Sequence, residues 1–164
     1  MNSKIVFNKD VNSATIYLMK VFSIDVSALW DHFTTADLLD QWWIPKPSKC
    51  QTIAMNFEQE GSWNYAIIAG NDQKQFAGVK YHEINFHRSF DWSHFVTDEA
   101  GNIDRSLPSA NWLIGFTGVE EGSKLTINIH FPNGREMDKV LQMDFEKQIQ
   151  SSLNQLEDLL DKKD

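Results

Sequence analysis

Cysteine is almost absent from this chain of 164 residues, because Cys50 is the only one. A single cysteine forms no internal disulfide and builds no cysteine-based metal cage. No apolar run approaches the roughly 20 residues that a membrane-spanning helix needs. The first ten residues carry only the short apolar run 5–7, far less than the apolar core of a signal peptide. We therefore expect a cytoplasmic protein with no membrane span.

Positive charge is also scarce. The chain has 15 Lys and Arg residues against 23 Asp and Glu residues, which gives a formal net charge of -8 at pH 7. Non-specific nucleic-acid binding depends on basic side chains that release counterions from phosphates, and anionic membranes attract clusters of basic residues. The composition therefore disfavours nucleic acids and membrane surfaces as partners.

No stretch is rich enough in proline, glycine or serine to act as a linker, and no internal repeat is found. The hydrophobic fraction of 41% and the charged fraction of 23% are typical of a globular domain. We expect one domain over residues 1–164, with its core between about 14 and 160. Aromatic residues are abundant by contrast, with 6 Trp, 11 Phe and 3 Tyr.

β-branched and aromatic residues predict a strand over 14–22. Apolar residues at helical spacing then predict a first short helix, which begins at Asp25 or Ser27, and a second that ends before Pro45. Downstream, short apolar runs separated by turn residues predict an antiparallel meander. Its strands are expected near 50–57, 62–69, 75–85, 89–96, 111–119 and 124–131.

The last part of the chain carries an apolar stripe at helical spacing from Met137 to Leu160. Asn133 and Glu136 precede it in the pattern of a capping box. A helix of about 25 residues would be about 37 Å long, enough to cross a whole sheet. The element order therefore predicts an α+β fold, in which six or seven antiparallel strands curve around one long C-terminal helix.

A strongly curved sheet need not contact its helix along the full length, so a ligand cavity between them is expected. The aromatic and aliphatic candidates to line it are Trp63, Tyr65, Trp92, Trp112, Ile114, Phe116, Phe145, Ile149 and Leu153. An ordinary filled core would use the same residues. Candidates for a polar group at one end of the cavity are Glu83, Arg88 and Asp91, although Arg88 also fits a surface ion pair. Trp42 and Trp43 are candidates for a gate or an interaction surface, or they lock the short helices onto the sheet.

Motifs for catalysis and metal binding are missing. The sequence contains no Gly-x-Ser-x-Gly or Gly-x-Gly-x-x-Gly pattern and no suggestion of a Ser-His-Asp or Cys-His pair. Its five histidines lack the spacing of a zinc motif, and only His82 and His94 are candidates to approach each other across neighbouring strands. We therefore predict no catalytic residue, no metal site and no cofactor.

Several motifs together carry a family resemblance. They are Trp30, the run Leu39-Asp40-Gln41-Trp42-Trp43-Ile44-Pro45, the run Glu60-Gly61-Ser62-Trp63, the segment 78–84 and the segment 88–92. In order and spacing they resemble the SRPBCC superfamily, and most closely the bacterial homologues of the C-terminal domain of the heat-shock-protein-90 ATPase activator. The resemblance covers about residues 14–160 and implies the helix-grip fold, also called START-like, which agrees with the element order.

Three functions remain open at this point. The leading hypothesis is a module that binds a small apolar or amphipathic molecule, such as a lipid, in a hydrophobic cavity. The resemblance implies a second, a protein-interaction domain that associates with a chaperone, and a third is an enzyme that uses the same cavity. Within the ligand hypothesis, we expect Leu156→Ala to destabilise strongly and Ile149→Ala to change ligand affinity instead.

Overall fold

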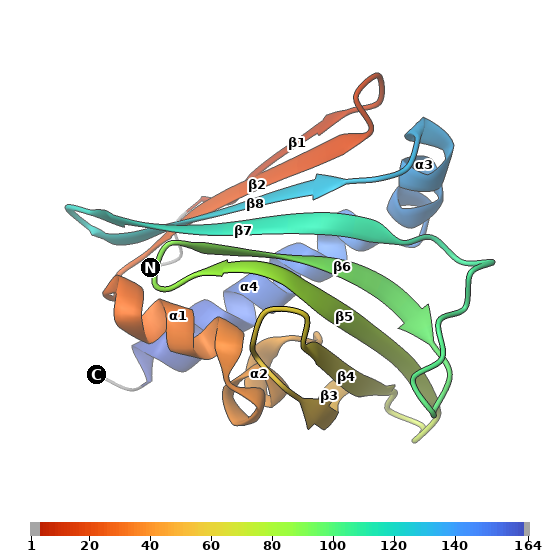
Figure 1. Ribbon diagram of the computed structural model, residues 1–164. Helices are drawn as coiled ribbons and strands as arrows, with labels where there is room; N and C mark the ends of the chain where they lie inside the picture. The colour runs from red at the N-terminus through yellow and green to blue at the C-terminus, as the bar shows by residue number, and fades with distance from the viewer. Residues whose placement is uncertain (1–3, 163–164) are drawn as a thin grey trace.

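The computed structural model describes residues 4–162, which form a curved antiparallel sheet of eight strands and four helices (Figure 1). The strands are β1 (Val6–Asp10), β2 (Thr15–Phe22), β3 (Lys49–Met55), β4 (Ser62–Ile68), β5 (Lys74–Asn85), β6 (Ser89–Thr97), β7 (Ala110–Val119) and β8 (Gly122–His130). The helices are α1 (Val26–Thr34), α2 (Ala36–Trp42), α3 (Gly134–Gln142) and α4 (Phe145–Asp161). The strand order β1-β2-β8-β7-β6-β5-β4-β3 contains the predicted meander, and the α+β class is confirmed.

The number of strands differs from the predicted six or seven because β1 is an additional strand at one edge of the sheet. β1 pairs with β2 in register from Val6 opposite Met19 to Asp10 opposite Thr15. Its last three residues are exposed, so its sequence carries no alternation of buried and exposed positions. The backbone hydrogen bonds to β2 define this strand, and hydrophobic patterning alone does not reveal it.

The predicted single C-terminal helix is wrong, because the chain forms two helices separated by Met143 and Asp144. Asp144 adopts a left-handed backbone conformation with φ 66° and ψ 32°, which no residue inside an α-helix can have. Asp tolerates this conformation better than most residues other than glycine. The apolar stripe continues across the break, so hydrophobic spacing did not disclose it.

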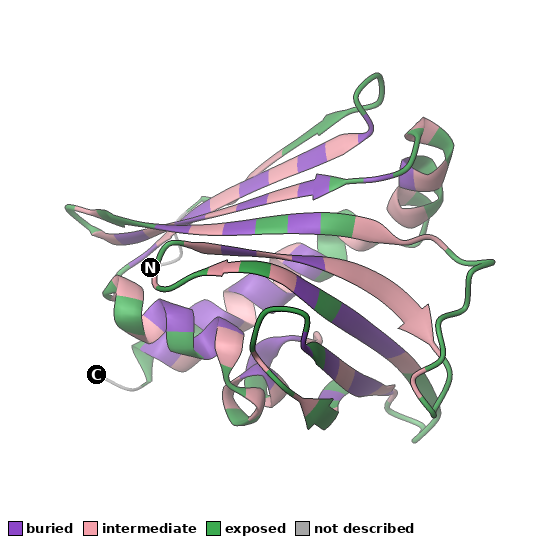
Figure 2. Cartoon of the chain, viewed as in Figure 1, coloured by how far each residue is buried: buried purple, intermediate pink, exposed green. Residues whose placement is uncertain are grey.

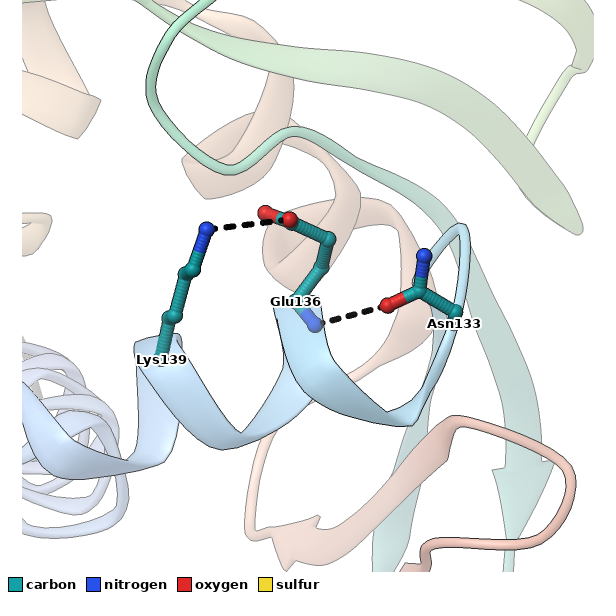
Figure 3. Close-up of polar contacts among 3 residues, drawn as sticks. All are labelled: Asn133, Glu136 and Lys139. Carbon is teal, nitrogen blue, oxygen red and sulfur yellow. Dashed lines mark hydrogen bonds and ion pairs between the residues drawn. The ribbon is translucent and has the colours of Figure 1, made fainter.

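α3 begins with a side-chain cap that matches half of the predicted capping box (Figure 3). The side-chain oxygen of Asn133 accepts a hydrogen bond of 2.9 Å from the backbone N–H of Glu136. The Glu136 carboxylate instead forms an ion pair of 3.1 Å with Lys139, one helical turn further on. The Asn133 side chain therefore satisfies one of the free N–H groups at the start of the helix.

The core lies between the sheet and the helices, with α4 crossing the sheet and α1 and α2 at one end (Figure 1). Buried and half-buried residues alternate along β2 and β8, as the period of two predicts (Figure 2). On α4 the buried stripe includes Ile149, Leu153, Leu156 and Leu160. Within residues 4–162, no helix is both long enough and apolar enough to cross a membrane.

Asp40 in the double-tryptophan run connects α2 to the neighbouring strand β3. Its Oδ1 accepts hydrogen bonds from the backbone N–H of Thr52 at 2.9 Å, from Thr52 Oγ1 at 2.7 Å and from Cys50 Sγ at 3.4 Å. Thr52 Oγ1 in turn accepts a bond of 3.0 Å from Trp63 Nε1. One carboxylate therefore orders the side chains of two adjacent strands.

We expect Asp40→Ala to lower the free energy of unfolding by about 1–3 kcal/mol, because it leaves partly buried donors of Thr52 without an acceptor. Asp37→Ala is the matched control, since this exposed aspartate lies in the first turn of the same helix. Its loss should stay below about 1 kcal/mol. Urea denaturation of both variants measures the difference, and equal losses would show that the Asp40 contacts contribute little.

Candidate functional site

A pocket of about 600 Å³ opens between the sheet and the junction of α3 with α4. Its sheet side comes from β4, β5, β6 and β7, from the loop that leads into β7 and from Phe131 after β8. Val140, Met143, Phe145 and Gln148 form its helical side. Figure 1 shows this junction far from α1. The pocket lies beside the point where the chain turns at Asp144, so that α3 and α4 do not form one straight helix.

Apolar side chains make up most of the pocket wall. Those with aromatic rings are Phe76, Trp112, Phe131 and Phe145. The Phe145 ring meets Trp112 edge-on, with 6.0 Å between ring centroids and an interplanar angle of 85°. Edge-to-face contact is a favourable arrangement of aromatic rings, so this pair links α4 to β7 at the pocket wall.

His94 is a polar residue of the pocket wall that contacts Tyr65 and Trp112. Its Nε2 lies 2.9 Å from the Tyr65 hydroxyl, and its ring lies nearly parallel to Trp112 with 5.8 Å between centroids. Burial lowers the pKa of His94 to about 4. The imidazole is therefore neutral at pH 7, with one ring nitrogen as donor and the other as acceptor.

The predicted cavity residues fall into two groups. Trp112 and Phe145 line the pocket. The others lie in the core and are absent from the pocket wall: Trp63, Tyr65, Trp92, Ile114, Phe116, Ile149 and Leu153, each at most 5% exposed. Tyr65 nevertheless acts on the pocket indirectly, because its hydroxyl holds His94.

Trp42 and Trp43 are enclosed, with exposed fractions of 0% and 6%, so neither ring presents an interaction surface. Trp42 Nε1 donates to the backbone carbonyl of His32 at 2.9 Å. The Trp43 ring lies 5.6 to 5.9 Å from those of Trp63, Trp92 and Trp112. The double tryptophan locks the short helices onto the sheet, and through Trp112 it supports the pocket wall.

Two polar residues of α4 hold the segment after the double tryptophan. Ser152 Oγ donates to the carbonyl of Trp43 at 2.8 Å, and Gln155 Nε2 donates to the carbonyls of Trp42 and Ile44 at 3.0 Å each. The Gln155 side-chain oxygen accepts from the Lys46 N–H at 2.8 Å. These bonds satisfy the carbonyls at the end of α2, where the helix has no partners of its own.

The predicted polar group lies at the far end of the β5–β6 hairpin from the pocket. Asp91 Oδ1 accepts a bond of 2.9 Å from the Glu83 N–H, at an irregularity in the register. The Arg88 carbonyl accepts from the Phe116 N–H at 2.8 Å. Glu83 and Arg88 are exposed, and none of the three lines the pocket. They shape the turn of this hairpin.

Cys50 and His82 each form a hydrogen bond with a neighbouring side chain. Burial raises the pKa of the Cys50 thiol, which donates to Asp40. His82 on β5 forms a hydrogen bond of 2.7 Å with Ser93 Oγ on β6. His94 follows Ser93 on β6 and therefore points to the opposite face of the sheet, away from His82. The described residues contain no group of three or more His, Cys, Asp and Glu side chains arranged to hold a metal.

The sequence did not identify most of the residues that line the pocket, among them Ile67, Ala77, Val96, Leu107 and Val140. Their positions depend on the break before α4, because an unbroken helix would cover the sheet differently. The alternation along β6 does place His94 and Val96 on one face with Trp92. The sequence could therefore have assigned His94 and Val96 to the inner face, but alternation does not show where along the strand the pocket opens.

A curved antiparallel sheet around a C-terminal helix, with a pocket at the sheet–helix boundary, is the helix-grip arrangement of the SRPBCC proteins. The family model described as "Activator of Hsp90 ATPase homolog 1-like protein" matches residues 23–161. The chain belongs to this family, as its motifs predicted. No curated protein matches the sequence.

Solved bacterial structures share the fold. A crystal structure of a protein from Mycobacterium smegmatis has a TM-score of 0.88 at 19% identity, covering 96% of this chain and 97% of that one. A solution structure from Staphylococcus epidermidis has a TM-score of 0.84 at 24% identity, covering 96% and 94%. The AHSA1 protein of Silicibacter pomeroyi has a TM-score of 0.74 at 16% identity, covering 92% and 100%. At these identities the likeness establishes the fold alone.

Proposed function

We propose that the protein binds a small apolar or amphipathic molecule in the pocket between the sheet and the α3–α4 junction. The observation that carries the proposal is the pocket itself, with a volume of about 600 Å³ and a mainly apolar wall. Ligand pockets of drug-sized molecules occupy roughly 300–1,000 Å³ and combine such walls with a few polar groups. His94, held by Tyr65, supplies one such polar group.

Closing the pocket with a large side chain tests this proposal. Ala110 lines the pocket from β7, and Ala110→Trp should lower the affinity for a bound molecule at least tenfold. The matched control is Leu113→Trp on the same strand, because Leu113 is 46% exposed and points away from the pocket. Ligands extracted from the native protein and identified by mass spectrometry provide the titrant, with an apolar library screened by thermal shift beside them.

Circular dichroism establishes that both variants are folded before the titration is interpreted. A folded Ala110→Trp variant that binds as tightly as the native chain would place the ligand elsewhere. A native protein that carries no ligand and shows no thermal shift with any library member would remove the proposal.

The second candidate function is a chaperone-associated interaction domain, which the family description favours. Exposed apolar side chains offer it a surface, and Phe86 at the tip of the β5–β6 hairpin is the most exposed of them at 73%. Its ring stacks on His87 with 3.8 Å between centroids. Stimulation of the ATPase of a cognate chaperone tests this function directly, and no change at saturating protein would exclude it.

A further inference from the structure

We infer that the molecule bound in the pocket is a free, single-chain amphipathic anion. Its apolar tail lies in the pocket, and its carboxylate or phosphate head lies at the mouth among Lys46, Lys74 and Lys147. The inference rests on the proposed function and adds to it the charge of the ligand and the direction in which the ligand enters.

A second cavity of about 410 Å³, called the mouth cavity below, lies beside the pocket. Ile67, Gln75 and Gln148 line both spaces, so the two cavities lie side by side. The far wall of the mouth cavity is formed by the segment 44–48 and by the start of α4. A molecule that leaves the pocket on this side therefore meets these residues first.

Three lysines border the pocket and the mouth cavity, although the net charge of the chain is -8. Lys74 is the charged residue that borders the pocket, and Lys46 and Lys147 line the mouth cavity. Asp144 is the carboxylate among the residues that line the mouth cavity, so two lysines and one aspartate border this space. None of the three lysines forms an ion pair with a residue in the described range 4–162.

The inner part of the pocket suits the apolar tail of the ligand better than its charged head. Its wall is mainly apolar, and the polar group that His94 contributes is neutral at pH 7 because burial lowers its pKa to about 4. A carboxylate or phosphate placed there would lose its water without gaining an opposite charge, which is costly. At the mouth the head remains in water and close to the lysines.

The experiment compares probes that share one tail and differ in the head. We expect isothermal titration at pH 7.4 and low salt to give decanoate and decyl phosphate an affinity about five- to tenfold higher than decanol, because exposed charge pairs each contribute modestly. In 1 M NaCl, where charges are screened beyond about 3 Å, this advantage should disappear. Equal affinities at low salt would overturn the inference and leave the proposed function standing.

A triple variant locates the head. Lys46→Gln combined with Lys74→Gln and Lys147→Gln should remove the advantage of decanoate and leave the decanol affinity unchanged. The control with the same change in net charge combines Lys9→Gln, Lys80→Gln and Lys124→Gln, none of which lines either cavity. Equal losses in the two triple variants would overturn the inference, whereas a failure of all three probes to bind would count against the proposed function itself.

Discussion

Replacing Glu157 by leucine should lower the free energy of unfolding by about 3–5 kcal/mol. Glu157 on α4 forms an ion pair of 3.3 Å with Lys20 on β2, and the two side chains are 7% and 0% exposed. With leucine at 157, the Lys20 ammonium group stays in the core without this carboxylate. Urea denaturation at pH 7 measures the loss.

Two further variants distinguish the cost of keeping the Lys20 charge in the core from the loss of the ion-pair contact itself. The double variant Lys20→Met, Glu157→Leu should regain most of the stability, because two apolar side chains of similar size replace the pair. Glu60→Leu removes the partner of Lys80 at the same distance of 3.3 Å, but in a pair whose side chains are 65% and 54% exposed. Its effect should stay within about 1 kcal/mol. Similar losses for Glu60→Leu and Glu157→Leu would contradict the explanation.

Lys20 also shows which structural features can be predicted from the sequence. Strand alternation places Lys20 on the buried face of β2 between Leu18 and Phe22. It does not show that Glu157, on the last helix, lies opposite, because that contact depends on how α4 crosses the sheet. The meander from β3 to β8 was predictable for the opposite reason, since each strand pairs with its neighbour in the chain.

The location of the pocket was less predictable than the fold. Alternation assigns Trp63, Trp92 and Trp112 to the inner face, but it does not say which of them is covered by a neighbouring ring. The Trp43 ring packs against all three, and only Trp112 also borders the pocket. The opening lies beside α3 because the chain turns at Asp144, a local backbone feature without a hydrophobic signature.

Ile149 does not lie where the sequence predicted relative to the pocket. The sequence predicted that Ile149 borders the cavity and that Ile149→Ala changes ligand affinity. In the structure Ile149 is 5% exposed and does not line the pocket, whereas Phe145, one turn earlier on α4, does. The variant expected to alter binding is therefore Phe145→Ala.

Leu156→Ala should destabilise the protein by about 2–5 kcal/mol, because Leu156 is fully buried and its truncation leaves a cavity in the core. Phe145→Ala should cost less than about 2 kcal/mol, since Phe145 is half-buried and already borders open space. It removes the ring that meets Trp112, so the affinity for a ligand in the pocket should fall about tenfold. Leu156→Ala should leave the affinity of the folded protein unchanged.

Urea denaturation and a binding titration on the same two variants decide between a packing role and a ligand role for each residue. The titration is carried out where both variants are fully folded, so that lost stability is not mistaken for lost affinity. Equal stability losses with unchanged binding in Phe145→Ala would make Phe145 an ordinary core residue. The ligand would then have to contact the sheet side of the pocket alone, through His94 and Trp112.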